Sequence, residues 1–354
     1  MNGPGDDTNR GSIEVAVIGA GSFGTALAII LAREGTGVRL WARRPVAAEY
    51  MSAERANPTY LPGARIPESV IVTSDIRTAV AGADFVVFAT PSHALRDAAA
   101  LVAPHIGTNA CVVSVAKGIE NGTLMTSSQV LADVMGGVPR SNIAVLYGPS
   151  HAEEVVAGVP TAVVVASPDP EVARKVQGLF MVRHFRVYAT TDIVGVEIAG
   201  SVKNVLAIAA GISDGVGFGD NAKAALITRG MAEMRRLGLA MGADSVTFAG
   251  LAGIGDLVVT CMSRHSRNRY LGEQIGRGRS LEEVQSEMKM IAEGVRTTRA
   301  VSELARRYDV EMPITDAVHD ILFDGKRPAD AVAELMSREA RDEDWYLPNA
   351  TAAE

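Results

Sequence analysis

Lys203 and Asn204 interrupt a mostly apolar segment, DIVGVEIAGSVKNVLAIAAG, at residues 192–211. If this segment is a helix of 3.6 residues per turn, Lys203 shares its face with apolar residues, and Glu197 lies on a different stripe. A lysine in that position either extends its ammonium group to the surface or is desolvated and suited to proton transfer. The segment alone leaves both interpretations open.

A second group of polar residues lies in GLAGIGDLVVTCMSRHSRNRYLGEQIGRG, residues 250–278. Asp256 follows two turn-forming glycines, and its carboxylate either orients an ammonium or a substrate hydroxyl or acts as an ordinary turn or cap residue. Ser266, Arg267 and Asn268 begin an expected helix, where backbone N–H groups, a hydroxyl, an amide and a guanidinium suit a phosphate monoester. A solvated basic face is the alternative, and the spacing does not choose between the two.

A glycine-rich loop near the start of the chain predicts a dinucleotide site. Gly19, Gly21 and Gly24 form GxGxxG directly after the apolar run at 14–20, and they open an Ala/Ile/Leu-rich helix expected over 22–34. In this motif the first glycine permits a tight turn, the second lets the backbone approach a pyrophosphate, and the third allows close packing of helix on strand. The strand and the helix around the motif favour this interpretation over ordinary turn glycines.

The end of the next expected strand, residues 38–43, bears on the choice of cofactor. Sites that prefer NAD usually place Asp or Glu there, on the adenine-side ribose. Here Arg43 and Arg44 follow Trp41 and Ala42, and no carboxylate is present. The arginines either meet a 2′-phosphate or stack on adenine, or they point to solvent. We expect NADPH to be accepted and favoured, with NADH use left open.

The elements that must position these residues fall into two regions. Apolar runs of strand length alternate with helical patterns through the first half, as in a doubly wound parallel sheet covered on both faces. The expected strands are 14–20, 38–43, 84–90, 110–117, 143–148, 161–167 and 183–190. Later segments are rich in Ala, Leu and Met. The fold class is therefore α/β, with a Rossmann-type dinucleotide-binding domain over 12–190, an all-helical substrate and catalytic domain over 191–337, and a peripheral C-terminal tail over 338–354.

Composition excludes several classes of function. The formal net charge of −7 argues against a protein that coats nucleic acid. Cys111 and Cys261 form no disulfide framework, and no Cys/His/carboxylate cluster has metal-ligand spacing, so we expect no metal and a cytoplasmic location. The long apolar run at 193–212 contains Glu197 and Lys203, and the first residues lack the pattern of a secretion signal. We therefore expect no membrane insertion.

Over residues 14–335 the chain resembles the bacterial-type NAD(P)-dependent glycerol-3-phosphate dehydrogenases. Six motifs carry this resemblance: GAGSFGTALA, AKGIE at 116–120, YGPSHA at 147–152, the helix with Glu197, Lys203 and Asn204, GLAGIGDLVVTC followed by SRNR, and IAEGVRT at 291–297. The departures are mild. Phe23 stands where the family often has Trp or Tyr, and Ser150 stands where it often has Thr but keeps the hydroxyl.

The resemblance implies a role for each matching position. Lys203 corresponds to the residue that exchanges a proton with the substrate oxygen, and Lys117 and Asp256 set its orientation and local field. The implied substrate contacts are Lys117, Gly148, Ser150, Lys203, Asp256, Ser266, Arg267 and Asn268. The implied cofactor contacts are Gly19, Gly21, Ser22, Phe23, Gly24, Arg43, Arg44, Lys117, Ala152, Arg267, Ile291 and Glu293.

The reaction that the resemblance implies is reversible hydride transfer from NADPH or NADH to dihydroxyacetone phosphate, which gives sn-glycerol 3-phosphate and feeds glycerophospholipid synthesis. The partner is then a small phosphate-bearing molecule, and a homodimer is expected. Two alternatives stay open at this point. One is another dehydrogenase of the 6-phosphogluconate or 3-hydroxyacid type, and the other is a non-catalytic NADPH-binding protein.

Overall fold

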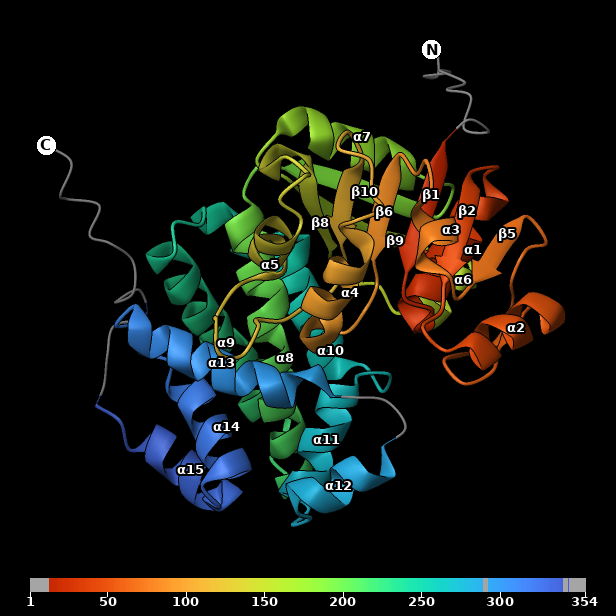
Figure 1. Cartoon of the computed structure of the whole chain (residues 1–354). Helices are drawn as coiled ribbons and strands as arrows, with labels where there is room; N and C mark the ends of the chain where they lie inside the picture. Colours follow the sequence, from red (N-terminus) through yellow and green to blue (C-terminus); the bar gives the residue numbers. More distant parts are fainter. Residues whose placement is uncertain (1–12, 289–291, 340–342, 344–354) are drawn as a thin grey trace, which may run out of the picture. The chain divides into compact units, whose positions relative to one another are not determined.

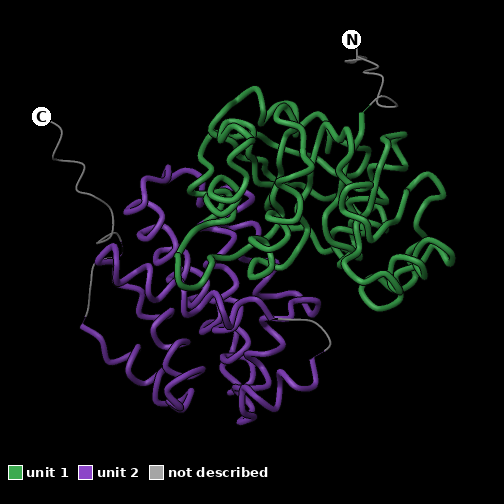
Figure 2. Tube along the Cα trace, viewed as in Figure 1, with its two compact units in different colours: residues 1–197 green, residues 198–354 purple. Residues whose placement is uncertain are grey.

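A computed structural model describes residues 13–288, 292–339 and 343 of the chain. The chain forms two compact units, residues 1–197 (unit 1) and 198–354 (unit 2), shown in Figures 1 and 2. The division falls inside one long helix. The domain limits expected at 190/191 and 337/338 stay predictions.

Unit 1 is built on an eight-stranded sheet of order β10-β9-β8-β7-β6-β1-β2-β5. The strands are β1 (Glu14–Ile18), β2 (Gly37–Trp41), β5 (Val70–Thr73), β6 (Phe85–Phe88), β7 (Cys111–Ser114), β8 (Ile143–Tyr147), β9 (Thr161–Ala166) and β10 (Phe185–Thr190). Alternate side chains of β1 enter two apolar clusters, with Val15 and Val17 in one and Ala16 and Ile18 in the other. Because both faces of the sheet are buried at its centre, every residue of β6, β7 and β8 is buried and these strands are nearly continuous apolar runs, as in a doubly wound sheet.

The predicted fold class is confirmed, but the expected parallel sheet is wrong for its last two strands. β1, β2, β5, β6, β7 and β8 run parallel, whereas β9 pairs antiparallel with β8 and parallel with β10. The segment between β8 and β9, residues 148–160, contains only the five-residue helix α6 and does not carry the chain back across the sheet. An apolar composition predicts that a strand is buried on both faces, but it does not predict the direction of the strand.

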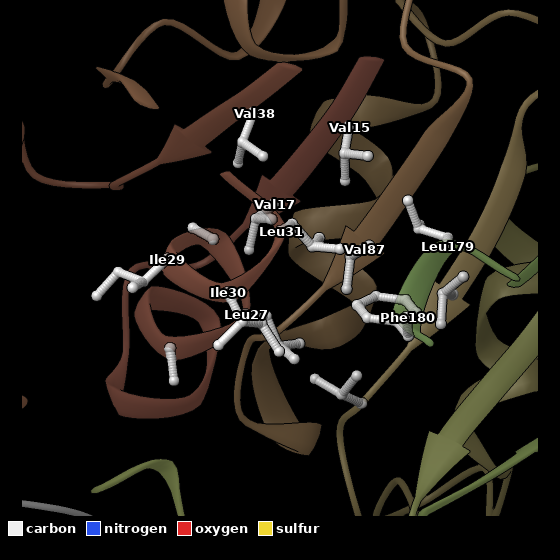
Figure 3. Close-up of a cluster of buried hydrophobic side chains, with 14 of the residues drawn as sticks. Val15, Val17, Leu27, Ile29, Ile30, Leu31, Val38, Val87, Leu179 and Phe180 are labelled. Atoms are coloured by element: carbon white, nitrogen blue, oxygen red, sulfur yellow. The ribbon is translucent and has the colours of Figure 1, made fainter. Parts of the chain in front are cut away.

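Helices cover both faces of this sheet (Figure 1). They are α1 (Ser22–Arg33), α2 (Pro45–Glu54), α3 (Ile76–Val80), α4 (Leu95–Val102), α5 (Ser127–Val134), α6 (Ala152–Val156) and α7 (Pro170–Phe180), with the short turns η2 (Ser92–Ala94) and η3 (Arg140–Asn142). Figure 3 shows part of the cluster between the sheet and helices α1 and α7, where Leu27, Leu31 and Phe180 pack with Val17 and Val87. This packing fixes the start of α1 at the carboxyl end of β1.

The structure adds a hairpin that the apolar pattern did not predict. β3 (Ala56–Asn57) and β4 (Leu61–Arg65) pair antiparallel between α2 and β5. Leu61 and Ile66 are fully buried in the same apolar cluster as α1. The hairpin is thereby anchored to the helix that follows the glycine-rich loop.

In the described part of unit 2 every regular element is a helix. The helices are α8 (Ile193–Val216, which begins in unit 1), α9 (Asp220–Ala240), η4 (Ser245–Ala249), the π-helical turn η5 (Leu251–Gly255), α10 (Asp256–Met262), α11 (Arg267–Gly276), α12 (Leu281–Glu287), α13 (Glu293–Arg307), α14 (Pro313–Phe323) and α15 (Pro328–Met336). Of the tail, Glu343 forms an ion pair with Arg229 of α9, and residues 344–354 lie outside the described residues.

Helix α8 is long and apolar enough to cross a membrane by length and composition alone. However, 89% of its most apolar window is buried inside the protein. Core helices of globular domains pass the same test, so one such helix is weak evidence for a span.

A buried carboxylate holds the start of α14. Glu233 of α9 is 1% exposed and accepts hydrogen bonds from the backbone N–H groups of Ile314 (2.6 Å) and Thr315 (3.1 Å) and from the Thr315 hydroxyl (3.1 Å). Burial raises the pKa of Glu233 to about 7, although these hydrogen bonds act in the opposite direction. The N-cap residue of α14 makes no side-chain cap hydrogen bond. Glu233 of the neighbouring helix α9 caps this N-terminus instead.

The raised pKa of Glu233 predicts a pH-dependent stability. Since the folded protein holds a proton that the unfolded chain releases between pH 4.5 and about 7, the free energy of unfolding should fall as pH rises through this window. The shift corresponds to about 3 kcal/mol. Urea unfolding at pH 5 and at pH 8 measures this difference in the free energy of unfolding. Glu233→Gln should flatten the dependence, and the exposed control Glu303→Gln should not; equal slopes in all three proteins would contradict the assignment.

Candidate active site

The glycine-rich loop of unit 1 has the geometry that the sequence predicts. Gly19 has φ +116°, and a Cβ there would lie 2.8 Å from the Ala89 carbonyl oxygen. A Cβ on Gly24 would lie 2.0 Å from the Gly19 carbonyl oxygen, so helix and loop touch through backbone. At Gly21, by contrast, a Cβ would meet nothing within 4 Å. Gly19 and Gly24 therefore allow close packing, whereas Gly21 leaves open space where a ligand can approach.

The start of α1 is suited to an anion. Gly21 is its N-cap and supplies no side-chain cap, and the first turn, which begins with Ser22 and Phe23, has no acidic residue. The first N–H groups of a helix lack partners within the helix and carry its positive dipole end. A pyrophosphate is the group that such a terminus binds in dinucleotide folds.

Arg43 and Arg44 lie exposed directly after β2, beside this loop. Trp41 is fixed because its indole N–H donates to the Ser74 carbonyl (3.0 Å) and its own carbonyl accepts from the Gly19 N–H (3.1 Å). Neither arginine forms an ion pair among the residues that the structure describes. Both guanidinium groups are therefore available at the position where the adenine ribose is read in this fold.

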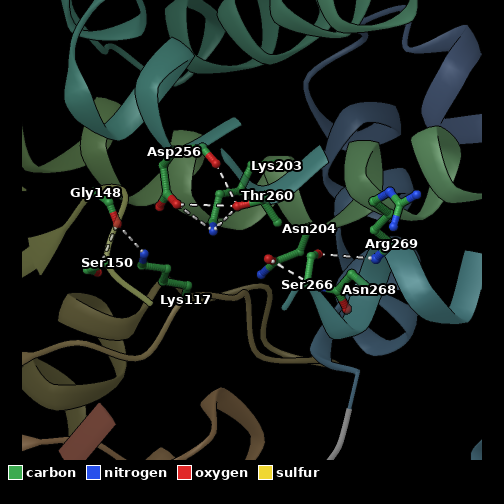
Figure 4. A network of polar contacts seen from close by, with 10 residues as sticks. All are labelled: Lys117, Gly148, Ser150, Lys203, Asn204, Asp256, Thr260, Ser266, Asn268 and Arg269. Atoms are coloured by element: carbon green, nitrogen blue, oxygen red, sulfur yellow. Dashed lines mark hydrogen bonds and ion pairs between the residues drawn. The ribbon is translucent and has the colours of Figure 1, made fainter. Parts of the chain in front are cut away.

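Three predicted substrate residues of unit 1 meet at one carbonyl group. The Lys117 ammonium donates to the Gly148 carbonyl oxygen (2.9 Å), and the Ser150 hydroxyl donates to the same oxygen (3.0 Å; Figure 4). Gly148 has φ +139°, and a Cβ there would lie 2.9 Å from the Cα of Val163. Ala152, predicted beside the cofactor, is buried at the first position of α6.

The Lys117 loop is held by residues that were not predicted from the sequence. The Ala116 carbonyl accepts hydrogen bonds from the hydroxyls of Tyr147 and Ser127. The Lys117 ammonium lies 5.8 Å from the centre of the Tyr147 ring, within cation–π range. Tyr147 is part of the YGPSHA motif, but buried tyrosines also occur in cores, so the residue type alone did not indicate this contact.

Glu197 anchors the start of α8 to α5. Its carboxylate accepts from the Thr126 hydroxyl (2.8 Å), the Ser128 N–H (2.7 Å) and the Ser128 hydroxyl (2.6 Å). Burial raises the pKa of Glu197, while these hydrogen bonds lower it. The residue thus ties the first turn of α8 to the N-terminus of α5, within unit 1.

In unit 2, Lys203 is buried and paired. It is 5% exposed, and its Nζ donates to Asp256 Oδ1 (2.8 Å) and to Thr260 Oγ1 (2.8 Å; Figure 4). Asp256 is 1% exposed and is the first residue of α10. The Thr260 hydroxyl donates back to the Asp256 carbonyl oxygen (2.6 Å). The surface interpretation of Lys203 is therefore wrong, and Asp256 orients an ammonium rather than acting only in a turn.

Thr260 is a contact that the sequence analysis missed. It lies one helical turn after Asp256, on the same face of α10. That spacing was visible in GDLVVT, but a helical threonine often bonds only the carbonyl of the preceding turn, so the spacing alone did not indicate a contact with Lys203.

Ser266 and Asn268 are held at the start of α11. Ser266 is its N-cap and accepts from the Arg269 N–H (3.2 Å). The Asn268 amide donates to Asn204 Oδ1 (3.1 Å), and its oxygen accepts from the Gly294 N–H (3.0 Å). The expected helix start is confirmed. Arg267 is exposed on its first turn.

A charged network that the sequence did not reveal joins α8, α9 and α11. Asp214 of α8 accepts from Arg269 (2.9 and 2.7 Å) and from Lys223 of α9 (2.5 Å). Arg269 is thereby directed to α8, so this arginine does not belong to the solvated basic face that was the alternative interpretation of the segment.

Helices α8 and α11 touch through their backbones. A Cβ on Gly211 would lie 2.0 Å from the Arg269 carbonyl oxygen, and one on Gly215 would lie 2.2 Å from that of Glu273. A Cβ on Gly272 would lie 2.1 Å from the Ile208 carbonyl oxygen. Glycines four residues apart on each helix therefore set the distance between Asn204 and Asn268.

Two further predicted positions and one acidic group lie near the end of unit 2 in sequence. Glu293 is half-buried at the first position of α13, and Ile291 lies outside the described residues. His319, Asp320 and Asp324 come close enough to hold a metal ion. The Lys326 ammonium already lies 3.2 Å from Asp320, and exposed acidic groups commonly carry no ion. The absence of a metal stays a prediction.

Comparison with known families decides the relationship. Residues 14–173 match the family model of the NAD-dependent glycerol-3-phosphate dehydrogenase N-terminus, and residues 192–333 match that of the C-terminus. The chain belongs to the NAD-dependent glycerol-3-phosphate dehydrogenase family. The resemblance inferred from the motifs is confirmed.

Individual relatives are similar in sequence to this chain over nearly its full length. "Glycerol-3-phosphate dehydrogenase [NAD(P)+] 2" of Salinibacter ruber is 60% identical over 334 residues, which cover 94% of this chain and 97% of the relative. The enzyme of that name from Chlorobium limicola is 56% identical over 331 residues, which cover 94% and 99%. The crystal structure of glycerol-3-phosphate dehydrogenase from Coxiella burnetii is 41% identical, with a TM-score of 0.88 over 93% of this chain and 100% of that one.

Proposed function

We propose that this protein is an NAD(P)-dependent oxidoreductase that reduces dihydroxyacetone phosphate to sn-glycerol 3-phosphate in a reversible hydride transfer. The observation that carries the proposal is the buried Lys203–Asp256 pair. It occurs in a chain that is 60% identical, over 94% of its length, to a relative named for this activity.

Unit 1 fits a nicotinamide dinucleotide by its own geometry. The open space at Gly21, the uncapped start of α1 and the exposed Arg43 and Arg44 match the needs of a pyrophosphate and a phosphorylated ribose. The residues proposed to hold the cofactor are Gly19, Gly21, Ser22, Phe23, Gly24, Arg43, Arg44, Lys117, Ala152, Arg267, Ile291 and Glu293. When bound, the reduced nicotinamide supplies the hydride.

Lys203 supplies the proton. As the carbonyl carbon gains a hydride, its oxygen becomes an alkoxide, and an ammonium group hydrogen-bonded to that oxygen both stabilises the developing charge and protonates it. Asp256 and Thr260 fix the Lys203 Nζ at 2.8 Å each, so that little reorganisation is needed when charge develops. In the oxidative direction the same nitrogen accepts the proton.

The remote phosphate positions the reacting carbon. Ser266, Arg267 and Asn268 are proposed to bind it at the start of α11, where the helix dipole and first N–H groups favour an anion. Lys117, Gly148 and Ser150 are proposed to contact the rest of the substrate. Binding energy from a group that does not react then holds the carbonyl in place for hydride transfer.

An initial-rate assay tests this function. NADPH oxidation should be fast with dihydroxyacetone phosphate and slow with unphosphorylated dihydroxyacetone, because the phosphate site would be unused. Folded protein that binds NADPH but reduces none of a panel of phosphorylated and carboxylated keto compounds would support a binding protein. NADPH oxidation restricted to a keto acid, or NADP+ reduction restricted to 6-phosphogluconate, would support another dehydrogenase type.

The arginines after β2 should set cofactor preference. If they meet a 2′-phosphate, KM for NADPH lies below KM for NADH in the wild type, and Arg43→Ala/Arg44→Ala raises only the former, by about tenfold for two charge-assisted hydrogen bonds near solvent. Steady-state kinetics with both cofactors measures this effect. The exposed control Arg140→Ala should change neither constant. A double variant that weakens both cofactors equally would show that the arginines stack on adenine instead.

Three further features belong to the proposal. The product, sn-glycerol 3-phosphate, would supply the glycerol backbone for glycerophospholipid synthesis in the cytoplasm. The partner is a small phosphate-bearing substrate, without nucleic acid, membrane insertion or metal. A homodimer, expected from the apolar helices of unit 2, is measurable by light scattering.

A further inference from the structure

Asn57 of the β3–β4 hairpin makes direct contact with the glycine-rich loop. The side chain is 4% exposed, and its Nδ2 donates to the Ala20 carbonyl oxygen (3.0 Å) and to Thr25 Oγ1 (2.8 Å). Its Oδ1 accepts from the Tyr60 N–H (3.4 Å), within its own hairpin. One buried amide thus joins an insertion in the sheet to both the loop and the first turn of α1.

The contact at Ala20 fixes the direction of a neighbouring N–H group. The Ala20 carbonyl and the Gly21 N–H belong to one peptide unit, and the described chain contains no cis peptide bond. In a planar trans peptide these two groups point in opposite directions. By holding the oxygen on the side of the hairpin, Asn57 directs the Gly21 N–H to the opposite side.

This peptide needs an outside anchor because glycines flank it. Gly19 and Gly21 accept backbone angles on both sides of φ = 0, so the peptides between them can reorient at little steric cost. Asn57 also binds Thr25, which is fully buried in α1. The loop peptide and the helix start are thereby held by the same side chain.

An amide satisfies this arrangement and a carboxylate does not. The Ala20 carbonyl oxygen can only accept, so this contact requires Nδ2 to donate, whereas an ionised aspartate, which is nearly the same shape, has acceptors alone and keeps only the contact with the Thr25 hydroxyl. An apolar side chain would leave the buried Thr25 hydroxyl without this partner. The hairpin itself does not depend on Asn57 for docking, since Leu61 and Ile66 are fully buried beside α1.

We propose that Asn57 is a positioning residue for the dinucleotide: it orients the peptide between Ala20 and Gly21 so that the N–H groups of the loop face the pyrophosphate. The inference rests on the proposed function only for the presence of a dinucleotide and not for the substrate. Asn57 acts through the loop and touches no reacting atom.

The test is cofactor binding by Asn57→Leu, which is close in size, neutral and unable to hydrogen-bond. NADPH fluorescence should show a rise in Kd of about tenfold, the loss expected when a well-placed hydrogen bond disappears. Asn57→Asp should show at least the same rise. The matched control is Asn109→Leu, at an exposed position between α4 and β7, which should leave Kd unchanged.

A second pair of ligands separates positioning from a general effect on folding. ADP carries a pyrophosphate, whereas 2′-AMP carries only the ribose phosphate expected at Arg43 and Arg44. Asn57→Leu should weaken ADP by about tenfold and 2′-AMP by less than twofold. Equal weakening of both ligands would assign Asn57 a merely structural role, and unchanged binding of ADP would overturn the proposal outright.

The two proposals fail in distinguishable ways. Wild-type protein that binds NADPH but does not reduce dihydroxyacetone phosphate would contradict the proposed reaction and leave the Asn57 test intact. If Asn57→Leu does not fold, Asn57→Asp and Thr25→Val, which each remove one side of the contact, are measured with the same two ligands. Retained ADP affinity in both folded variants would then contradict the positioning role.

Discussion

Lys203→Ala is expected to lower kcat by at least about 10²-fold while leaving Kd for NADPH within about twofold of the wild type. The variant loses the group that protonates the developing alkoxide, whereas the proposed dinucleotide contacts of unit 1 keep their side chains. Initial rates at saturating substrate and NADPH fluorescence titration measure the two quantities. The exposed control Lys175→Ala, on α7, should change neither.

The same variant also has a predictable cost in stability. Asp256 is 1% exposed, and removing its ammonium partner leaves a buried charge uncompensated, which typically costs about 3–5 kcal/mol. Lys203→Met/Asp256→Asn removes both charges and should recover most of this loss in urea unfolding without recovering turnover. If the folded double variant turns over at the wild-type rate, Lys203 is not the proton donor.

The local features of the fold were predictable because they depend on neighbouring residues. The strand, glycine loop and helix at 14–34 follow from apolar runs and from the three glycines, and the structure places β1 and α1 there. Ser266 was expected to begin a helix, and it caps α11. Each prediction rests on backbone rules that act over a few residues.

The partners of the candidate site residues were not predictable in the same way. The acidic partner of Lys203, Asp256, lies 53 residues further along the chain, on α10. Asp214 meets Arg269 across 55 residues. Such pairs depend on how helices pack, which residue spacing along one helix does not encode. The family resemblance supplied Lys203 and Asp256 but not the hydrogen bond between them, and it assigned no role to Asp214, Arg269 or Thr260.

The direction of β9 and the β3–β4 hairpin were missed for another reason. Val-rich strands look alike whether they run parallel or antiparallel once both faces are buried. The hairpin contains Pro58, Pro62 and Gly63, residues that indicate a loop rather than strands. Asn57, which contacts the cofactor loop, lies in this unpredicted element.

Gly272→Ala is expected to destabilise the protein by about 3 kcal/mol, although alanine is intrinsically the better helix former by about 1 kcal/mol. The new Cβ would lie 2.1 Å from the Ile208 carbonyl oxygen and 3.0 Å from the Ile212 nitrogen. Both are backbone atoms of α8, so the clash cannot be relieved by rotating a side chain. Helix α11 must shift as a whole.

Gly178→Ala on α7 is the matched control for this prediction, because its Cβ would meet nothing within 4 Å. The control should be neutral or slightly stabilising in thermal unfolding, whereas Gly272→Ala should lower Tm by about 6–12 °C. Below its Tm, Gly272→Ala should also raise KM for dihydroxyacetone phosphate, since a displaced α11 moves Asn268 away from Asn204. Equal melting temperatures for the two variants would mean that the α8–α11 contact is loose and does not set the spacing of the proposed phosphate site.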